Sequence, residues 1–326
     1  MKILVTGAAG YIGATLTAHL LSAGMDVVAL DKLVYGGEAI LSFFSHPRFR
    51  LVQGDVRDGA LLRKVMRGVD GTVHLAAVVG EAACSIDEEA AWSINYGGTQ
   101  QVLSAARECG TKYFIFVSTC SNYGVSMPNV VADEESPLKP LSQYAKSKVE
   151  AERAVLQDAS RTCVCVLRFG TICGLSSRMR FDLLISEMAR AAALGESVRI
   201  FAPEAWRPFL HVRDAARVIG HCLGRSPEEL RGKVYNVVGE NLQKTGLIAL
   251  VLKHYPKVTI EITDKQPDLR DYRVSGERIK NEIGFRAGHT VEEAFLETSA
   301  AVSSGVFRDP HWSGHSAVPD NALRLR

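Results

Sequence analysis

A tyrosine and a lysine stand four residues apart in the segment SQYAKSKVEAER, residues 142–153. Residues with this spacing lie one above the other on the same face of an α-helix, so Tyr144 and Lys148 would project together. An ammonium beside a phenol favours the phenolate and lowers the pKa of a tyrosine from its usual value of about 10. The pair is therefore either an ordinary surface contact or a group that takes a proton at neutral pH.

A threonine 25 residues upstream favours the second interpretation. Thr119 ends the apolar run KYFIFVST, and ligands of open α/β sheets bind beyond the carboxyl ends of such strands. With Tyr144 and Lys148 it would form an acid–base group in which the threonine holds a substrate oxygen beside the phenol. An isolated YxxxK is more often a coincidence, but within a nucleotide-binding fold the catalytic interpretation is favoured.

The segment TGAAGYIG near the N-terminus predicts such a fold. Three glycines, Gly7, Gly10 and Gly13, stand between a predicted strand and a predicted helix, and we place Tyr11 and Ile12 with them at the cofactor. Glycines here permit a tight turn and let the backbone approach a pyrophosphate at the positive end of the helix. The spacing alone is weak, but its position after a strand and before a helix indicates dinucleotide binding rather than a purely structural turn.

The next strand predicts which dinucleotide is bound. Asp31 ends that strand, 18 residues after Gly13, where a carboxylate accepts hydrogen bonds from ribose hydroxyls and repels a 2′-phosphate. This favours NAD over NADP, although the adjacent Lys32 leaves room for NADP. The further side chains that we place along the cofactor follow the third and fourth strands: Asp55, Val56, Leu75, Ala76 and Ala77.

Strand-like and helix-like segments alternate through the first half of the chain. Short, continuously apolar runs such as KILVTG and DVVALD are typical of parallel strands that are covered on both faces. Helices are predicted near 59–67, from about 88 to 109 and over 142–158. This alternation predicts an α/β fold, a doubly wound parallel Rossmann sheet, with a smaller C-terminal α/β substrate-binding lobe.

The pattern also suggests where the parts of the chain divide. We expect an NAD-binding domain over 1–170, a substrate-binding lobe over 171–305 and an irregular tail over 306–326. Residues near 206–239 are predicted to rejoin the first domain, because KVYNVVG has the composition of another buried strand. His311 and His315 lie in the tail with no third ligand in sight, so we predict no metal site.

The overall composition excludes several other classes of protein. The 326 residues are 47% hydrophobic and 23% charged, with a formal net charge of +2, which gives no case for nucleic-acid or membrane binding. No apolar run reaches the roughly 18–20 residues of a membrane span. The first strand begins almost at Met1, so no signal peptide is expected. The seven cysteines form no CxxC pair, which fits a reduced, cytoplasmic setting.

Taken together, these motifs resemble the extended short-chain dehydrogenase/reductase family, the NAD-dependent nucleotide-sugar epimerases and dehydratases, including UDP-glucose 4-epimerase-like enzymes. The resemblance covers nearly the whole chain, through TGAAGYIG, GDVRD, HLAA, NYGGT, YAKSK, WRPFLHVRDAARV and YNVVG. It implies NAD as cofactor and a nucleotide-diphosphate sugar as substrate. Tyr144 would be the general base, Lys148 its partner and a ligand of the nicotinamide ribose, and Thr119 the catalytic hydroxyl.

The resemblance implies further roles. Asn95 matches the family's buried asparagine that supports the site, and Arg207 matches the arginine that contacts the substrate diphosphate. Arg178, Arg180 and Arg270 are further candidate substrate contacts, with a solvated basic patch as the alternative for Arg178 and Arg180. Helices such as 90–109 and 142–158 pair with their copies in many relatives, which implies a homodimer through a helix bundle.

Two positions at which this sequence differs from the family's motifs narrow the range of possible reactions. Thr171 stands where many relatives have a phosphate-binding asparagine, so that contact is in doubt. The 4,6-dehydratases have an Asp-Glu pair after the catalytic threonine, whereas this chain has Cys120 and Ser121, neither a convincing acid or base for elimination. Epimerisation, at C4, is therefore the preferred prediction.

Other functions stay open. A nucleotide 4-keto-sugar reductase or a UDP-uronic-acid decarboxylase of the same family would use the same three residues, and a non-catalytic dinucleotide-binding sensor is the remaining alternative. Glu81 and Cys84, in the segment after HLAA, either line the pocket or cap a turn.

Overall fold

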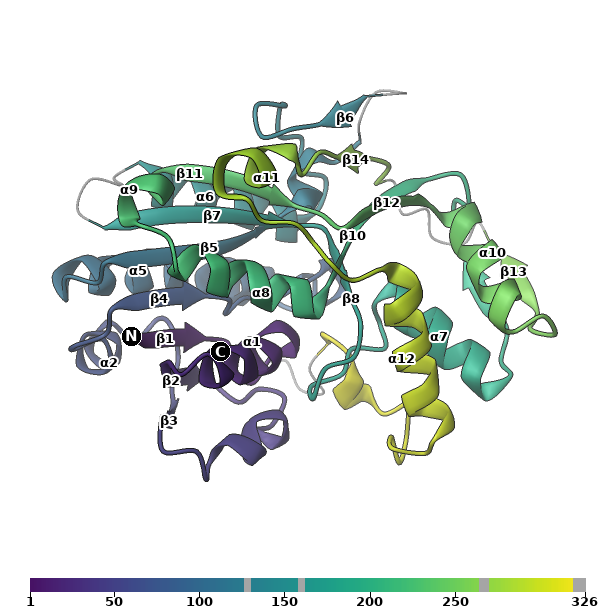
Figure 1. Cartoon of the computed structure of the whole chain (residues 1–326), viewed down its shortest axis with the longest axis horizontal. Coiled ribbons are helices and arrows are strands. Elements are labelled where there is room, and N and C mark those ends of the chain that lie inside the picture. The colour runs from purple at the N-terminus through teal and green to yellow at the C-terminus, as the bar shows by residue number, and fades with distance from the viewer. Residues whose placement is uncertain (126–129, 158–161, 264–269, 319–326) are drawn as a thin grey trace.

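The computed structural model describes residues 1–125, 130–157, 162–263 and 270–318. Its centre is a seven-stranded parallel sheet in the order β11-β7-β5-β4-β1-β2-β3 (Figure 1). The strands are β1 (Lys2–Thr6), β2 (Asp26–Asp31), β3 (Phe49–Gln53), β4 (Gly71–His74), β5 (Tyr113–Thr119), β7 (Cys163–Phe169) and β11 (Lys233–Val237). The predicted doubly wound parallel sheet is confirmed. Strand order reverses between β1 and β4, which is where open α/β sheets bind ligands.

Helices cover both faces of this sheet. On one face lie α1 (Tyr11–Ser22), α8 (Val212–Leu223) and α11 (Glu277–Ile283), and on the other lie α2 (Gly59–Val65), α5 (Thr99–Glu108) and α6 (Gln143–Leu156). The strands alternate between these two cores: in β5, Ile115 packs against the first set and Phe114 and Phe116 against the second. Continuous apolar runs are the expected sequence of strands that are buried on both faces.

The predicted helix over 88–109 is one continuous stretch with a change of winding in its middle. It consists of α4 (Glu88–Trp92), a π-helical segment η2 (Ser93–Gly98) and α5, and it follows the short helix α3 (Glu81–Cys84). Such π-helical turns occur frequently at functional sites. The predicted helix over 142–158 is α6, which Ser142 caps by accepting a hydrogen bond from the Ala145 amide at 3.1 Å; residue 158 lies outside the described residues.

A smaller α/β region lies beside the carboxyl edge of the sheet (Figure 1). Its strands are β8 (Thr171–Cys173), β10 (Trp206–His211) and β12 (Glu240–Gln243) in one sheet, and β9 (Val198–Ile200) with β13 (Ile260–Ile262) in another. Its helices are α7 (Leu184–Leu194), α10 (Lys244–His254) and α12 (Val291–Ser303). Within the stretch 206–239, β10 therefore belongs to the three-stranded sheet, whereas α8 and β11 return to the central one.

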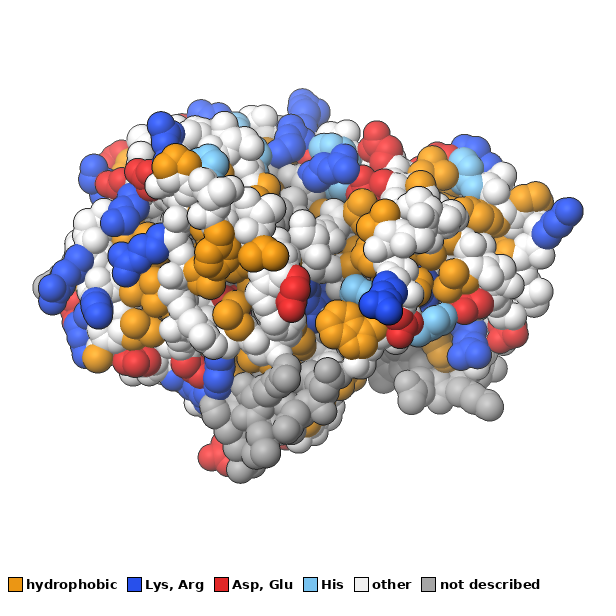
Figure 2. Space-filling view, turned by 90° about the horizontal axis from the view of Figure 1, so that it is seen from below, with side chains coloured by type: hydrophobic (Ala, Val, Ile, Leu, Met, Phe, Trp, Pro, Cys, Tyr) orange, Lys and Arg blue, Asp and Glu red, His pale blue; other side chains and the backbone are white. Residues whose placement is uncertain are grey.

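Short elements complete the described chain. They are η1 (Glu38–Phe43), η3 (Cys120–Tyr123), β6 (Val131–Ala132) paired with β14 (Arg273–Val274), α9 (Pro227–Leu230) and η4 (Ser313–His315). None of the helices in the described ranges is both long and apolar enough to cross a bilayer. The face shown in Figure 2 carries basic and acidic side chains intermingled with apolar ones.

Candidate active site

The glycine turn packs too closely for side chains. Gly7 has a φ of +71°, and a Cβ added there would lie 2.9 Å from the Ala76 amide nitrogen, while one added at Gly13 would lie 2.1 Å from the Gly7 carbonyl oxygen. Gly10 precedes α1, and no side chain of the described residues caps the helix there. The positive end of α1 therefore opens onto the switch point with its amides available, which fits the pyrophosphate of a dinucleotide.

Asp31 is fixed beside this turn. Its two carboxylate oxygens accept hydrogen bonds from the backbone amides of Ala9 at 2.9 Å and Leu33 at 2.8 Å. Burial raises the pKa of Asp31, and these two hydrogen bonds oppose the rise. Each carboxylate oxygen can accept further bonds, so the residue fits the predicted contact with ribose hydroxyls.

Lys32 and Asp55 form one ionic group. The Lys32 ammonium lies 3.1 Å from Asp55, and Arg57 binds the same carboxylate with two nitrogens, at 3.0 and 2.7 Å. Burial would raise the pKa of Asp55, but hydrogen bonds from Arg57 and Lys32 outweigh it and lower the value to about 2. Lys32 is thus held by a carboxylate in this structure. Val56, which was also predicted to lie along the cofactor, is buried and packs against Gly98. A Cβ added at Gly98 would lie 2.7 Å from the Val56 side chain.

The loop after β4 is anchored through a buried histidine. Thr6 accepts hydrogen bonds from the amides of Leu75 and Ala76, both at 3.2 Å, and its hydroxyl lies 2.7 Å from His74 Nδ1. The other ring nitrogen lies 3.0 Å from the Thr99 hydroxyl. Burial, with the Lys148 charge as the second cause, lowers the pKa of His74 to about 3. The neutral ring therefore joins β1, β4 and the start of α5.

Asn95 connects the π-helical segment to the helix that carries Tyr144. Its amide oxygen accepts from the Val78 backbone at 2.7 Å, and its amide nitrogen donates to the Val78 carbonyl and to the Ser147 hydroxyl, both at 3.0 Å. Ser147 in turn donates to the Tyr144 carbonyl at 2.8 Å. This agrees with a supporting role, because the chain of bonds fixes the position of α6.

Thr119 and Tyr144 meet where β5 ends, and Lys148 follows one turn further along α6. The Thr119 hydroxyl forms a hydrogen bond with the Tyr144 phenol. Lys148 is buried, with only 3% of its surface exposed, and its ammonium lies 4.0 Å from the centre of the Phe116 ring. Burial lowers the pKa of Lys148 to about 7, against the opposing charge of Glu152. No hydrogen bond of this ammonium is found within the described residues, so it is available to a ligand such as a ribose hydroxyl.

One expectation about this group is wrong. Lys148 was expected to lower the pKa of Tyr144, but burial raises that pKa, and the opposing influences are the Arg180 charge and the Thr119 hydrogen bond. The reason is geometric. Lys148 is directed at the Phe116 ring, whereas Arg180 approaches the phenol from the segment after β8.

A buried ion pair lies one turn beyond Lys148 on α6. Arg168 on β7 binds the Glu152 carboxylate with Nε, at 3.0 Å, and with Nη2, and Ser118 donates to the same carboxylate at 2.8 Å. Arg168 also donates to the Tyr123 hydroxyl at 2.8 Å. Both charged side chains are almost fully buried. The sequence analysis missed this pair, although Glu152 continues the spacing of four residues from Tyr144 and Lys148.

Two of the predicted arginines come together on the substrate side. Arg207 is buried and donates to the Arg270 carbonyl, and the Arg270 guanidinium lies 3.4 Å from the Ser121 hydroxyl. Tyr272, also 3.4 Å from Ser121, completes the group and lies close enough to Tyr144 to influence its pKa. Tyr272 was missed by the sequence analysis; its place two residues after Arg270 was the available signal.

The other two arginines come from the segment after β8; Arg178 lies near Asp31, and Arg180 lies close enough to Tyr144 to lower its pKa. The Arg178 guanidinium is 4.3 Å from the centre of the Tyr35 ring and lowers the pKa of Asp31. Arg180 binds Asp182 with two nitrogens, at 2.9 and 2.6 Å. Arg180 and the Tyr272 beside Arg207 and Arg270 both influence the pKa of Tyr144, so two arginine-bearing segments approach this residue.

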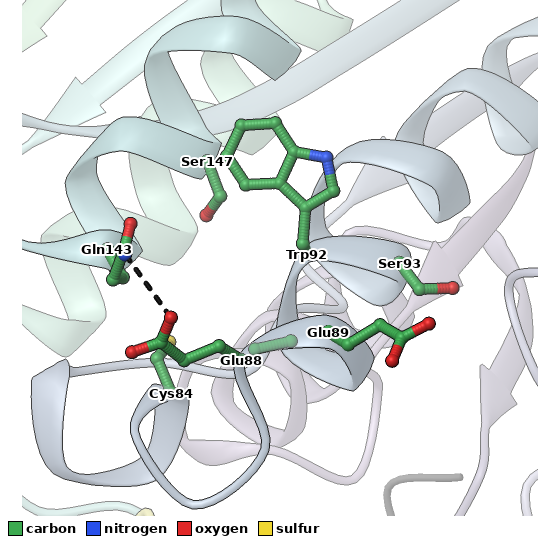
Figure 3. A pocket seen from close by; sticks show the side chains of 8 residues that line it. Cys84, Glu88, Glu89, Trp92, Ser93, Gln143 and Ser147 are labelled. Atoms are coloured by element: carbon green, nitrogen blue, oxygen red, sulfur yellow. Dashed lines mark hydrogen bonds between the residues drawn. The ribbon is translucent and has the colours of Figure 1, made fainter.

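A pocket of about 430 Å³ lies between α6 and the segment formed by α3, α4 and the start of η2 (Figure 3). It is lined by Cys84, Glu88, Glu89, Ala91, Trp92, Ser93, Gln143 and Ser147. Gln143 donates to Glu88 at 3.3 Å, and its backbone amide donates to Glu81 at 3.0 Å. Cys84 thus lines this pocket, with a pKa that burial raises to about 12, whereas Glu81 caps the start of α6. Thr119, Tyr144 and Lys148 are not among the lining residues.

Comparison with known proteins gives a consistent result. Residues 3–238 match the NAD dependent epimerase/dehydratase family. The chain is 31% identical over 316 residues to a dTDP-glucose 4,6-dehydratase of Streptomyces griseus, covering 91% of this chain and 93% of that one. It is 27% identical over 330 residues to a UDP-glucose 4-epimerase of Corynebacterium glutamicum, covering 92% and 96%. A solved structure of MoeE5 with UDP-glucuronic acid and NAD has a TM-score of 0.82 and 25% identity, covering 94% of this chain and 100% of that chain.

Proposed function

The chain belongs to the NAD-dependent epimerase/dehydratase family, and from this premise we propose that it is a nucleotide-sugar epimerase that acts at C4 of the sugar. NAD is the cofactor of this family. The glycine turn, the Asp31 carboxylate and the buried Lys148 ammonium form a set of groups that suits it: an open helix N-terminus for the pyrophosphate, an acceptor for ribose hydroxyls and a donor for the second ribose.

In this proposal the side chains move a proton and hold the sugar, while bound NAD supplies hydride acceptance and return. Tyr144 takes the proton of the C4 hydroxyl, and Thr119 holds that oxygen beside the phenol. Arg180 stabilises the phenolate charge, since it lowers the pKa of Tyr144 against burial. Arg207 and Arg270 bind the substrate diphosphate, for which forked guanidinium donors are well suited.

One observation favours epimerisation over dehydration although the relatives include dehydratases. The residue after Thr119 is Cys120, whose thiol is buried and points at the Arg168 carbonyl, with sulfur and oxygen 3.3 Å apart. Burial raises the pKa of this thiol far above neutral, and Ser121 beyond it has only a hydroxyl. Elimination needs a second acid–base pair next to the sugar. Epimerisation needs only Tyr144 as acid and base, because the 4-keto sugar rotates in the pocket and takes the hydride back on its other face.

Substrate and reaction can be tested together. The protein, purified without added cofactor, is mixed singly with UDP-, dTDP-, CDP- and GDP-sugars, with UDP-glucuronic acid included because the MoeE5 complex contains it. Absorbance near 340 nm and the products are followed. A new C4 epimer with no net NADH supports the proposal.

Other products would overturn it and name the alternative. Turnover only with supplied NADH or NADPH would indicate the keto-sugar reductase, release of carbon dioxide the decarboxylase, and loss of water a dehydratase. NAD binding without turnover of any of these sugars would favour the non-catalytic sensor.

A further inference from the structure

Residues 315–318, which we call the strap, lie against the segment that follows β2. The Tyr35 hydroxyl donates to the Ala317 carbonyl at 2.5 Å, and Arg178 donates to the Ser316 carbonyl at 2.6 Å. The Ala317 amide donates to Asp182 at 3.2 Å. Two separate parts of the chain, the segment after β2 and the segment between β8 and α7, therefore hold the strap through its backbone.

The strap also has an apolar contact with the catalytic tyrosine. Ala317 is only 6% exposed and belongs to a hydrophobic cluster with Val78 and Cys84, against which Val34 and Tyr144 pack. Preceding it, His315 accepts a hydrogen bond from the Phe181 amide at 2.8 Å, and its ring stands edge-on to the Phe181 ring, 5.3 Å between centres. The strap thus reaches from the Asp31 end of the site to Tyr144.

This is the direction that a bound dinucleotide follows, from the ribose contact at Asp31, past the glycine turn, to Tyr144 and Lys148. The groups that would bind the cofactor are not used by the strap. In the described contacts, its hydrogen bonds to residues outside 312–318 go to Tyr35, Arg178, Asp182 and Phe181, and none goes to Asp31, the start of α1 or Lys148. A segment that competed for the site would be expected to take those groups.

We propose that the strap is the outer wall of the dinucleotide site and that its function is to retain NAD. The proposal rests on NAD binding by the family and extends the proposed epimerisation, in which NADH must not leave before it returns the hydride. Retention by a wall that is hydrogen-bonded to two separate segments requires those bonds to break before the cofactor can dissociate.

Two truncated chains test the proposal. A chain ending at Gly314 lacks the strap, and a chain ending at Val318 keeps it and serves as the matched control. NAD content after purification and the dissociation rate of isotopically labelled NAD are measured without any sugar. We expect at least about tenfold faster dissociation from the shorter chain, since several hydrogen bonds are lost, and an unchanged rate from the control. Equal rates, or tighter NAD binding by the shorter chain, would overturn the proposal.

A point variant keeps the test valid if the shorter chain does not fold. Tyr35→Phe removes the hydrogen bond to Ala317 and keeps the ring against Arg178. We expect roughly fivefold faster NAD dissociation, because the loss of one hydrogen bond corresponds to a change of about this size. The control Tyr96→Phe on η2 should leave the rate unchanged. An unchanged rate for Tyr35→Phe would contradict the proposal. Because no sugar is present, the result is independent of whether the enzyme is an epimerase.

Discussion

At the residue scale, the ammonium of Lys148 faces the Phe116 ring in a buried position, and its pKa is lowered to about 7. Its charge therefore changes within the pH range in which the protein would work. A hydroxyl that accepts a hydrogen bond from Lys148 favours the charged form and raises this pKa again. Binding of a ribose at this position and protonation of Lys148 are thus coupled.

Tyr144 is the residue on which turnover should depend. Tyr144→Phe keeps the ring that packs against Ala317 and removes the proton acceptor. We expect turnover to fall by at least about 10²-fold, the usual contribution of a general base, with NAD content unchanged. Steady-state kinetics measures turnover, and the amount of NAD in the purified protein measures cofactor binding. Full activity of this variant would exclude Tyr144 as the base.

His74 should make stability depend on pH. Its pKa is about 3 in the folded protein and 6.5 for the free side chain, so the unfolded chain binds more protons between these values. Stability should therefore rise with pH across this window, by up to about 1.4 kcal/mol per pH unit from this group. The stabilisation that His74 contributes in its neutral form is therefore lost as the pH falls from 6.5 towards 3.

The contribution of His74 is isolated by substitution. Urea unfolding between pH 4 and 6.5 would be compared for the natural chain, His74→Gln and the control His46→Gln in the turn before β3. The slope of stability against pH should be smaller only in His74→Gln. The same slope in all three proteins would show that His74 is not a buried neutral group.

At the element scale, α6 is held at two levels. Near its start, Asn95 and Ser147 fix the Tyr144 carbonyl, and one turn beyond Lys148 the Glu152 carboxylate binds Arg168 on β7. The first contact comes from the π-helical segment and the second from the central sheet. The height and rotation of α6, and with them the positions of the proposed catalytic side chains Tyr144 and Lys148, follow from these contacts.

Glu152→Gln should therefore weaken the fold strongly. It leaves the buried Arg168 guanidinium without its counter-ion, which typically destabilises a protein by about 3–5 kcal/mol. Glu150→Gln on the same helix removes an exposed pair with Arg153 and should change stability by less than about 1 kcal/mol. Urea unfolding compares the two. Equal effects would mean that the buried pair does not hold α6.

The elements were predicted from sequence more reliably than their contacts. The strands of the central sheet were predictable because burial on both faces requires uninterrupted apolar runs, and the glycine turn because its packing excludes side chains. The contact of Lys148 with Phe116 was not, since it depends on how α6 crosses β5. The pairing of Ala317 with Tyr35 joins residues far apart in the chain, and no local spacing indicates it.

At the scale of the whole molecule, we propose a homodimer through the outer faces of α5 and α6. Sedimentation and a substitution on this surface test the proposal. Gln100 and Ser104 on α5 and Lys146 on α6 are exposed. Sedimentation should give about twice the chain mass of 35.5 kDa. Ser104→Arg, which would bring two like charges together near the helix contact, should lower the mass towards one chain, whereas Ser304→Arg after α12 should not. A single-chain mass for the natural protein would contradict the proposal.

The hydrogen bond between Tyr35 and Ala317 also bears on how the protein is made. Its partners are 282 residues apart, and chains grow at about 5–20 residues per second, so Tyr35 leaves the ribosome about 15–55 s before Ala317. During that time the glycine turn and Asp31 have already been synthesised, but the strap that we propose as the outer wall of the site has not. In this proposal a nascent chain meets NAD at a surface without its outer wall, and the wall can form only when synthesis has passed residue 317.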